Sequence, residues 1–358
     1  MTTRLERLAL SALLVIVVGM PTAVLAYYFG LYPRPAQQAR TINIVAAAPE
    51  AGGFQPDVLR IAAGEPVRLR FSVPDVTHGI AIGPGVGIDL GPVEPGHVKE
   101  VETTFDRPGR YTIYCNTWCS PYHWRMRGTI EVYDPAHPEQ LPPAGHALAD
   151  AVITRLIEQG VDIDAPHPAP LAPPTERPSA VRGAAMAREV ALPPEMNDPV
   201  WRRAHSPAQA YALLRGVAPA LAVVPYRRKG GVQQAWDAVA FAWLHDMTLE
   251  SRAWAADQYA RNCAACHSET GDGQGLGGEA LRAQGIGGHD HTQAGRPAAF
   301  ADPETMLGGS SNIYYAKIRR GGMGTGMPDF GPIFTEDEVW ALVNYLWTFQ
   351  FDQAPLGK

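Results

Sequence analysis

The stretch from Cys115 to Met126 constrains this chain more than any other part of it. It follows the pattern C-x3-C-x3-H-x2-M, so two thiols, one imidazole and one thioether are crowded into a short segment. Such soft and borderline ligands favour copper over magnesium or calcium. A further histidine, His78, lies upstream in Asp75-Val76-Thr77-His78-Gly79. The pattern predicts a metal centre with candidate ligands Cys115, Cys119, His123, Met126 and His78.

All four cysteines of the chain fall into two closely spaced pairs. The second pair lies in Cys263-Ala264-Ala265-Cys266-His267. C-x-x-C-H is the attachment signal of c-type heme, with the cysteines as thioether donors and His267 as the proximal iron ligand. A disulfide is the alternative interpretation of a cysteine pair in an exported protein, but the spacing argues against it for both pairs.

A second iron ligand is expected downstream of the heme signal. Gly326-Met327-Pro328-Asp329-Phe330 fits the methionine–proline pattern of class I cytochromes c, so we expect Met327 to be the sixth ligand. Met323 is the competing candidate. Histidine–methionine ligation raises the heme potential into the range of respiratory electron carriers.

The N-terminus predicts a membrane anchor. Arg4, Glu6 and Arg7 precede an uncharged run from Leu8 to Tyr28, long enough to cross the roughly 30 Å of bilayer hydrocarbon as a helix. The arginines favour an N-terminus on the inner side. Because Val24-Leu25-Ala26 resembles a cleavage site, a removed signal peptide is the alternative.

At 358 residues the chain is too long for one ordinary domain. Beyond an anchor at 1–35, residues 36–140 carry short alternating apolar strands with Pro/Gly turns, which predicts a small Greek-key domain with the cysteines in a loop after a strand. We expect a proline-rich linker at 141–180, with a helix over 146–159, and a helical heme domain at 251–352. There, a helix over 249–262 leads into the heme signal, and Thr335 with Glu338 predicts a capping box at the start of a C-terminal helix.

Residues 181–250 are helical by pattern and hold no obvious ligand set, yet they echo the C-terminus. The echoing segments begin at Tyr211, Val224 and Trp236, against Tyr315, Met327 and Trp340. His167 lies before Val224 at a spacing similar to that of His267 before Met327. Two interpretations stand at this stage. The region is a degenerate, heme-free cytochrome c domain that begins near residue 145, or it is a helical spacer with chance similarity.

The metal motif resembles the binuclear CuA centre of subunit II of the heme–copper oxidases. Phe54-Gln55-Pro56, the His78 segment and Cys115-Asn116-Thr117-Trp118-Cys119 resemble its B-type version, which has one N-terminal anchor. The resemblance implies bridging thiolates from Cys115 and Cys119, terminal ligands His78 and His123, and axial ligands Met126 and the Thr117 carbonyl. A mononuclear copper site would leave Cys119 redundant, and a zinc site would leave Met126 without a role.

Anchor, CuA domain and cytochrome c domain in this order resemble a caa-type subunit II. This implies a multidomain fold: a transmembrane helix, an all-β cupredoxin-like Greek-key domain and an all-α cytochrome c domain. The implied cofactors are binuclear CuA and one covalent heme c. The implied route runs from an external donor such as a cytochrome c, through heme c and CuA, to a catalytic subunit I that reduces oxygen. The anchor would hold the chain in a bacterial cell membrane, with both cofactor domains on the periplasmic side.

Two other functions fit the same motifs: the small subunit of a CuA-containing nitric-oxide reductase, and a free-standing periplasmic electron carrier. A formal charge of −6 argues against nucleic acid as a partner. Three aromatic residues near the copper motif, Phe54, Trp118 and Trp124, have two open interpretations. They face a donor or the heme domain, or they are ordinary packing residues.

Overall fold

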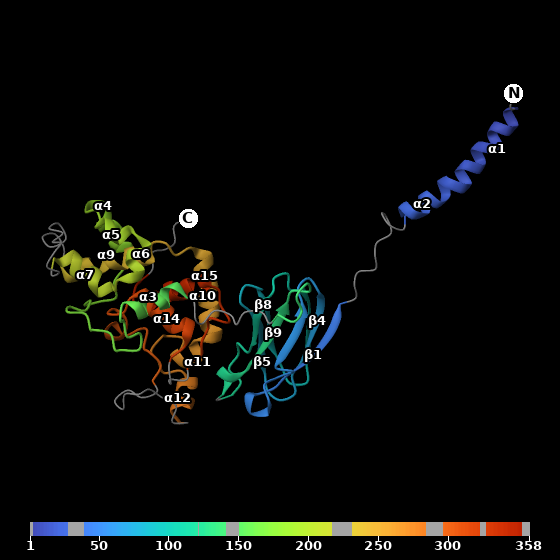
Figure 1. Cartoon of the computed structure of the whole chain (residues 1–358). Helices are drawn as coiled ribbons and strands as arrows, with labels where there is room; N and C mark the ends of the chain where they lie inside the picture. The colour runs from blue at the N-terminus through green and yellow to red at the C-terminus, as the bar shows by residue number, and fades with distance from the viewer. Residues whose placement is uncertain are drawn as a thin grey trace.

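The computed structural model describes residues 3–27, 39–120, 122–140, 150–216, 231–283, 296–322 and 327–352. Along the chain it has an apolar N-terminal helix, a β domain and a helical body (Figure 1). This order confirms the predicted fold class: an apolar helix, a cupredoxin-like β-sheet domain and a helical C-terminal region.

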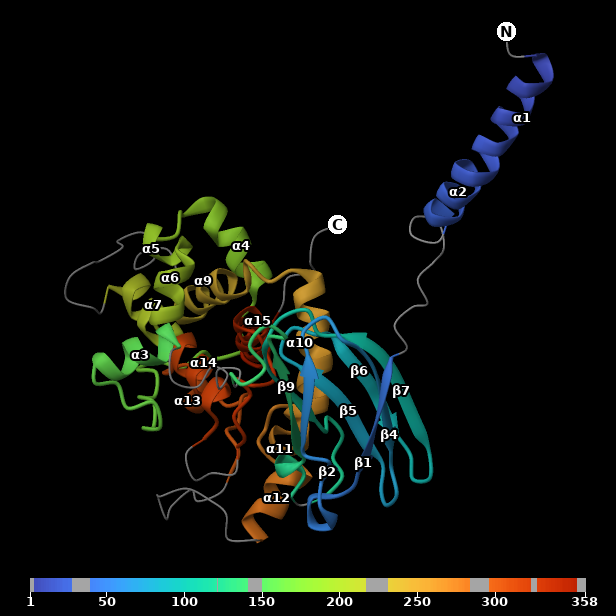
Figure 2. The same ribbon diagram turned by 45° about the vertical axis from the view of Figure 1, so that its right-hand side comes forward.

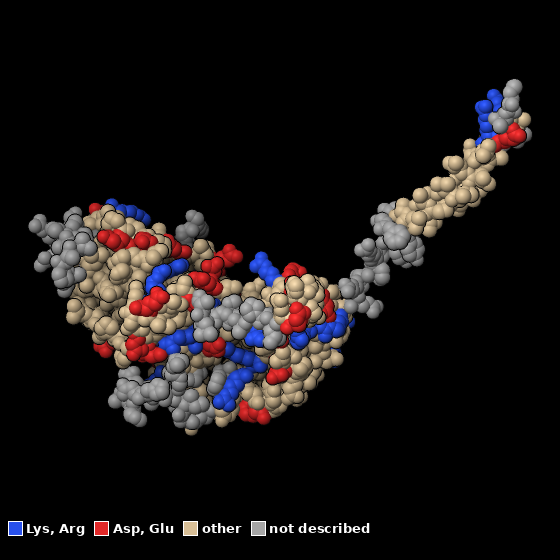
Figure 3. All heavy atoms as spheres, in the orientation of Figure 1, with Lys and Arg blue, Asp and Glu red and all other residues tan. Residues whose placement is uncertain are grey.

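The N-terminal helix is continuous through α1 (Arg4–Leu14), the π-helical turn η1 (Val15–Gly19) and α2 (Met20–Ala26). Thr3 and Glu6 form a capping box at its start. The segment Glu6–Ala26 has a hydropathy of 2.5 and buries none of its side chains, and Figure 3 shows charged groups only at its tip. A helix of this length and composition fits a single membrane crossing.

The β domain consists of two sheets packed face to face. One has the strand order β2-β1-β4-β7 and the other β3-β9-β8-β5-β6. The pairs β1–β4 and β3–β9 are parallel, and the remaining pairs are antiparallel. The strands are β1 (Arg40–Ala46), β2 (Phe54–Gln55), β3 (Val58–Ala62), β4 (Pro66–Ser72), β5 (His78–Gly83), β6 (Ile88–Val93), β7 (Val98–Thr104), β8 (Gly109–Tyr114) and β9 (Arg127–Tyr133).

Alternation of apolar and polar residues builds this sandwich, as predicted. In β4, Val67, Leu69 and Phe71 are buried, whereas Arg68 and Arg70 between them are exposed. Apolar side chains from both sheets meet in one core. That burial is the main contribution to the stability of such a sandwich. The short 3-10 turns η3 (Pro49–Ala51) and η4 (His123–Arg125) lie in its loops.

Helices dominate the rest of the described chain. They are α3 (Ala151–Glu158), α4 (Ala180–Glu189), α5 (Pro194–Asn197), α6 (Pro199–Ala204), α7 (Pro207–Arg215), α9 (Val232–Leu244), α10 (Leu249–Asn262), α11 (Ala264–His267), α12 (Leu276–Ala283), α13 (Pro303–Met306), α14 (Ser311–Arg320), α15 (Glu336–Leu346) and the 3-10 turn η5 (Trp347–Phe349). We call α4, α7 and α9 the first helical unit. The second helical unit is the described part of residues 249–352, with α10, α14 and α15 as its main helices and the short helices α11, α12 and α13 between them. Both units contribute to one hydrophobic core.

Two details of the second helical unit confirm sequence predictions. Helix α10 spans the predicted residues 249–262. Thr335 caps α15 by accepting a hydrogen bond from the Glu338 amide, while the Glu338 side chain accepts one from the Thr335 amide. The apolar stripe of α15 is buried: Val339, Leu342, Val343 and Leu346.

The proline-rich segment before α4 packs against the helical body. At its start, Asp150 accepts hydrogen bonds from Tyr315 and Arg319. Further along, Trp236 Nε1 donates to the Ala172 carbonyl over 2.8 Å. The helix expected over 146–159 is α3, and residues 141–149 lie outside the described part. This proline-rich segment, which we call the strap, therefore lies over the helices.

The β domain and the second helical unit lie side by side, with α10 next to the β-sheets in both views (Figures 1 and 2). At the contact, Arg127 of β9 pairs with Asp329 over 2.7 Å. A Cβ atom on Gly83 of β5 would overlap the Ile333 carbonyl, so the two backbones touch there. The buried cluster of the helical body also includes Ala81 and Tyr114 from the β domain.

Candidate metal centre and heme attachment site

The metal motif occupies the loop between β8 and β9, at one end of the sandwich. Cys115 directly follows β8, and its amide donates to the Met126 carbonyl over 3.2 Å, which closes the base of the loop. His78 begins β5, which pairs with β8. A Cβ atom on Gly79 would overlap the Asn116 side chain, so glycine lets this loop lie directly against β5.

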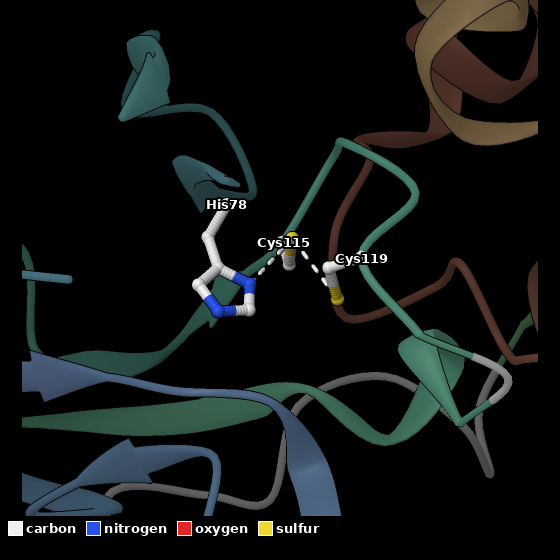
Figure 4. Close-up of side chains that lie close together, drawn as sticks. All are labelled: His78, Cys115 and Cys119. Carbon is white, nitrogen blue, oxygen red and sulfur yellow. Dashed lines mark hydrogen bonds between the residues drawn. The ribbon is translucent and has the colours of Figure 1, made fainter. Parts of the chain in front are cut away.

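The structure brings all six predicted donors together. His78 Nδ1, Cys115 Sγ and Cys119 Sγ lie in a row (Figure 4), within 4.8 Å of one another. The two sulfur atoms are 3.9 Å apart, about twice the length of a disulfide bond of about 2.05 Å. The other contacts are His78 Nδ1 to Cys115 Sγ 3.9 Å, His123 Nδ1 to Cys119 Sγ 3.5 Å, the Thr117 carbonyl to Cys115 Sγ 3.1 Å and Met126 Sδ to Cys119 Sγ 3.9 Å.

Electrostatics in this loop favour a cation. The hydrogen bond from the Cys119 thiol lowers the pKa of Cys115 to about 3, despite burial, and His123 and His78 add to the effect. The hydrogen bond with Cys115 and burial raise the pKa of Cys119. One thiolate therefore forms readily, and a second buried negative charge requires a positive partner. A bound copper ion supplies that charge, so the donor set fits copper.

Three residues that support this site escaped the sequence analysis. Asp75 Oδ1 lies 2.9 Å from His78 Nε2, which leaves Nδ1 of His78 facing the sulfur atoms. Burial lowers the pKa of His78, but its hydrogen bonds with Cys115 and Asp75 outweigh burial and raise the pKa overall. Asn116 Nδ2 donates to Asp89 over 3.1 Å. Asp75 and Asn116 had a sequence signal, since they belong to the motifs of His78 and Cys115, whereas Asp89 had none.

The heme signal forms a tight turn at the end of α10. Cys263 is the C-cap residue of α10, and α11 carries the rest of the signal to His267. His267 Nδ1 lies 3.0 Å from the Ala298 carbonyl, so Nδ1 donates and Nε2 keeps a free lone pair. The imidazole stacks on Phe300 at 4.3 Å between ring centres. This is the arrangement that orients an axial histidine.

The second cysteine pair differs electrostatically from the first. Burial raises the pKa of Cys263 to about 12 and that of Cys266 to about 11, so both are neutral thiols. Burial also lowers the pKa of His267, which keeps the imidazole neutral for metal binding. The residues present therefore fit a covalently attached heme.

Glycines pack tightly around this turn. A Cβ atom on Gly275 would overlap the Ala265 carbonyl, and one on Gly278 would lie 3.3 Å from the Cys266 carbonyl. Met327 is half-buried against the same core, and its carbonyl accepts a hydrogen bond from the Gly322 amide over 3.1 Å. Met323, the competing ligand, lies outside the described residues. Met327 stays the proposed sixth ligand.

The three aromatic residues near the copper motif have different positions. Phe54 is 1% exposed and packs edge-on against Phe71, so it is a core residue. Trp118 faces the second helical unit, where a Cβ atom on Gly277 would lie 2.8 Å from its Cζ3 atom. The Trp124 side chain lies outside the described part.

Comparison with known proteins shows a cytochrome c domain and a similarity to cytochrome c oxidase subunit 2. The model of the Cytochrome c family matches residues 254–350. Two curated proteins named cytochrome c oxidase subunit 2, both from Thermus thermophilus, are each 39% identical to this chain over 83 residues. These matches cover 23% of this chain and 59% and 48% of the relatives, so the chain spans about half the length of the curated relatives it matches.

Among solved structures, a heme–copper terminal oxidase dimer is 22% identical, over 36% of this chain and 100% of that chain, with a TM-score of 0.24. The periplasmic domain of subunit II of the Bradyrhizobium japonicum cytochrome oxidase is 19% identical, over 29% of this chain and 89% of that chain, also at 0.24. The two-sheet β sandwich and the match to the Cytochrome c family define the class: a protein with a cupredoxin-like domain and a cytochrome c domain. The sequence matches fit a cytochrome c oxidase subunit II of the caa type, fused to a cytochrome c domain.

Proposed function

We propose that this chain is the subunit II of a respiratory heme–copper oxidase, which receives electrons from an external donor and delivers them to a catalytic subunit I that reduces oxygen. The observation that carries the proposal is the position of the copper-type donor set directly beside the helical unit with the heme signal. The similarity to subunit 2 of cytochrome c oxidase supports membership in such a complex.

In this proposal the loop after β8 holds a binuclear copper centre. Cys115 and Cys119 would bridge the ions, and His78 and His123 would each bind one of them. Met126 and the Thr117 carbonyl would be weak axial ligands. Asp75 orients His78, and the burial of Cys115 and Met126 keeps water away. A donor set fixed by strands rearranges little when its charge changes, which favours fast electron transfer.

The second helical unit would hold one heme c. Cys263 and Cys266 would attach it, and His267 and Met327 would be its axial ligands. The Ala298 carbonyl and the Phe300 ring fix the His267 ring in place. When bound, the heme and the copper centre each take up and release one electron at a time.

The proposed location is a bacterial cell membrane, with the N-terminus inside and both cofactor domains on the periplasmic side. The N-terminal helix would keep them beside subunit I. Fusing the two cofactor domains replaces a diffusional encounter by a tethered one at high effective concentration. The external donor would be a soluble or membrane-bound protein such as a cytochrome c.

Isolation of the native complex tests this proposal. We expect the full chain to copurify with a heme–copper catalytic subunit, and the complex to consume oxygen. Cys119→Ser should lower the copper content of the chain by at least half and stop oxygen consumption. The matched control is Tyr122→Phe in the same loop, which keeps the ring that covers Arg125 and should leave copper content unchanged.

Two results would contradict the oxidase assignment. Turnover with nitric oxide but not with oxygen would make the partner a nitric-oxide reductase. A chain that is isolated alone from native membranes, with both cofactors bound and no catalytic subunit, would be a free-standing electron carrier.

A further inference from the structure

One aromatic side chain lies between the two candidate cofactor sites. Trp118 immediately precedes Cys119, and its ring centre lies 5.7 Å from that of His123 at an interplanar angle of 53°. On the other side the indole reaches the heme signal. A Cβ atom on Gly277 would lie 2.8 Å from Trp118 Cζ3 and 2.9 Å from Cys266 Sγ. The Trp118 Cζ3 atom and the Cys266 Sγ atom are therefore separated by no more than the sum of these two distances.

Gly277 keeps the space between the indole and the sulfur free of any side chain. Its backbone does not require glycine, because its φ lies outside the left-handed range in which other residues are strained. The contact is the reason for glycine: a methyl group there would press on Trp118, on Cys266 and on the Ala265 carbonyl at 3.0 Å.

Polar contacts fix the two sides of this junction. Asp89 accepts a hydrogen bond from Asn116 of the metal loop and lies 3.5 Å from Arg261 of α10. On the other flank, Arg127 pairs with Asp329, two residues after the proposed ligand Met327. The first contact joins the metal loop to the second helical unit through Asp89, and the second contact joins strand β9 to the same unit. The position of Trp118 is therefore held from both sides.

We propose that Trp118 is the positioning residue that couples the two redox sites electronically, by filling the gap between the ligand His123 and the attachment sulfur of Cys266. This inference rests on the function proposed above. In each event one electron leaves the reduced heme side, which is oxidised, and arrives at the copper side, which is reduced. The indole neither gains nor loses an electron, and no proton moves. Its π system fills much of the gap, so the through-space steps that remain, across which tunnelling decays steeply, are shorter.

The test is intramolecular electron transfer in the full chain carrying both cofactors, after an added photoactivated reductant donates one electron to the heme during a short light pulse. We expect Trp118→Leu to slow the transfer about tenfold or more, and Trp118→Phe to slow it less. Midpoint potentials and the visible spectrum of each site should stay unchanged, since Trp118 is not a ligand. Tyr122→Leu removes an aromatic ring from the same loop, which covers Arg125, and should leave the rate within about twofold.

A second variant approaches the indole from the heme side. Gly277→Ala should displace the Trp118 ring without replacing any residue of the copper loop, and slow the transfer while the copper spectrum is unchanged. Wild-type rates in both Trp118→Leu and Gly277→Ala would overturn the inference. So would a slowed transfer that is fully accounted for by a shifted potential. If the wild-type chain transfers electrons between its sites but copurifies with no oxidase, only the proposed function fails.

Discussion

The two helical units share a stacked tyrosine–tryptophan pair but differ in whether they carry heme-attachment residues. In the first, Tyr211 stacks on Trp236 with ring centres 4.6 Å apart and an angle of 12°. In the second, Tyr315 stacks on Trp340 at 4.4 Å and 22°. Only the second carries the cysteines and histidine of a heme signal. The same packing can therefore persist without attachment residues, and we propose on this ground that the first unit is a degenerate cytochrome c domain and not a helical spacer with chance similarity.

The units differ in how their first and last helices meet. In the first, α4 crosses α9 at Gly183, where a Cβ atom would overlap the Asp237 carbonyl. In the second, Tyr259 of α10 and Tyr345 of α15 meet at 5.5 Å between ring centres, and the Tyr259 hydroxyl donates to the Ser268 carbonyl beside the heme signal. In the first unit, the first and last helices are in direct backbone contact. In the second unit they meet through aromatic rings, and one of these rings also donates a hydrogen bond to the turn of the heme signal.

The largest expected effect separates the units by their chemistry. Replacing Cys263 and Cys266 together by alanine should abolish covalent heme, because no thiol remains at the heme signal to form a thioether. Heme staining after denaturing electrophoresis, with the mass of the intact chain, measures this. Cys115→Ser is the control and should leave the covalent heme in place. A mass corresponding to two hemes per wild-type chain would contradict the division into a heme-bearing and a heme-free unit.

Local patterns in the sequence predicted much of this structure. Helix α10, the capping box at Thr335 and both cysteine pairs depend on neighbours within a few residues. Contacts between distant segments could not be predicted in this way. Arg127 and Asp329 are 202 positions apart, and nothing local marks either as a partner of the other. The packing of Trp118 against Gly277 depends on how the two domains dock. The periodicity of the sequence does not encode that docking.

The similarity between the first unit and the C-terminus is visible in the sequence, but the structure places one of the matched residues elsewhere. His167, which the spacing aligned with His267, does not lie in the first unit. Its ring packs edge-on against Tyr314 of the second unit, with 5.5 Å between ring centres and an angle of 90°. The proline-rich strap brings His167 to the second unit. The spacing of residues along the chain does not predict the path that the strap takes.

The close helix crossing gives the next largest effect. Gly183→Val should destabilise the chain by about 3 kcal/mol, because the added methyl groups must push α4 away from the α9 backbone. Ala185→Val on the exposed face of the same helix is the matched control for β-branching and should cost about 0.5 kcal/mol. Chemical denaturation followed by circular dichroism compares the two. Equal losses would mean that the first unit is not closed by backbone contact.

A pH effect tests where His167 belongs. Burial, with the nearby charge of Lys317, lowers the pKa of His167 to about 4. In the unfolded chain the pKa is about 6.5, so between these values the unfolded state binds the proton and the native state does not. Stability should therefore fall as the pH drops from about 6.5 to 4, by about 1–2 kcal/mol once partial exposure is allowed for.

The measurement is the free energy of unfolding at pH 7 and at pH 4.5, in the wild type and in His167→Phe. The variant should lose less stability on acidification than the wild type. His137→Phe, at an exposed position of the chain, is the control and should retain the wild-type difference. An unchanged acid sensitivity in His167→Phe would show that this ring does not lie against Tyr314 in the folded chain.

The smallest effect distinguishes the two stacked tryptophans. Trp236 Nε1 donates to Ala172, whereas Trp340 Nε1 is buried without a hydrogen-bond partner among the described residues, beneath the Arg203 guanidinium at 4.0 Å. Substitution by phenylalanine removes the same volume from each site, so the packing costs largely cancel. Trp236→Phe also orphans the Ala172 carbonyl, while Trp340→Phe removes an unpaired donor and weakens only the cation–π contact. We expect Trp236→Phe to lower the free energy of unfolding by about 1 kcal/mol more than Trp340→Phe. Equal or reversed losses would mean that the strap at Ala172 contributes nothing to the first unit, and that the two stacks are equivalent in energy as well as in geometry.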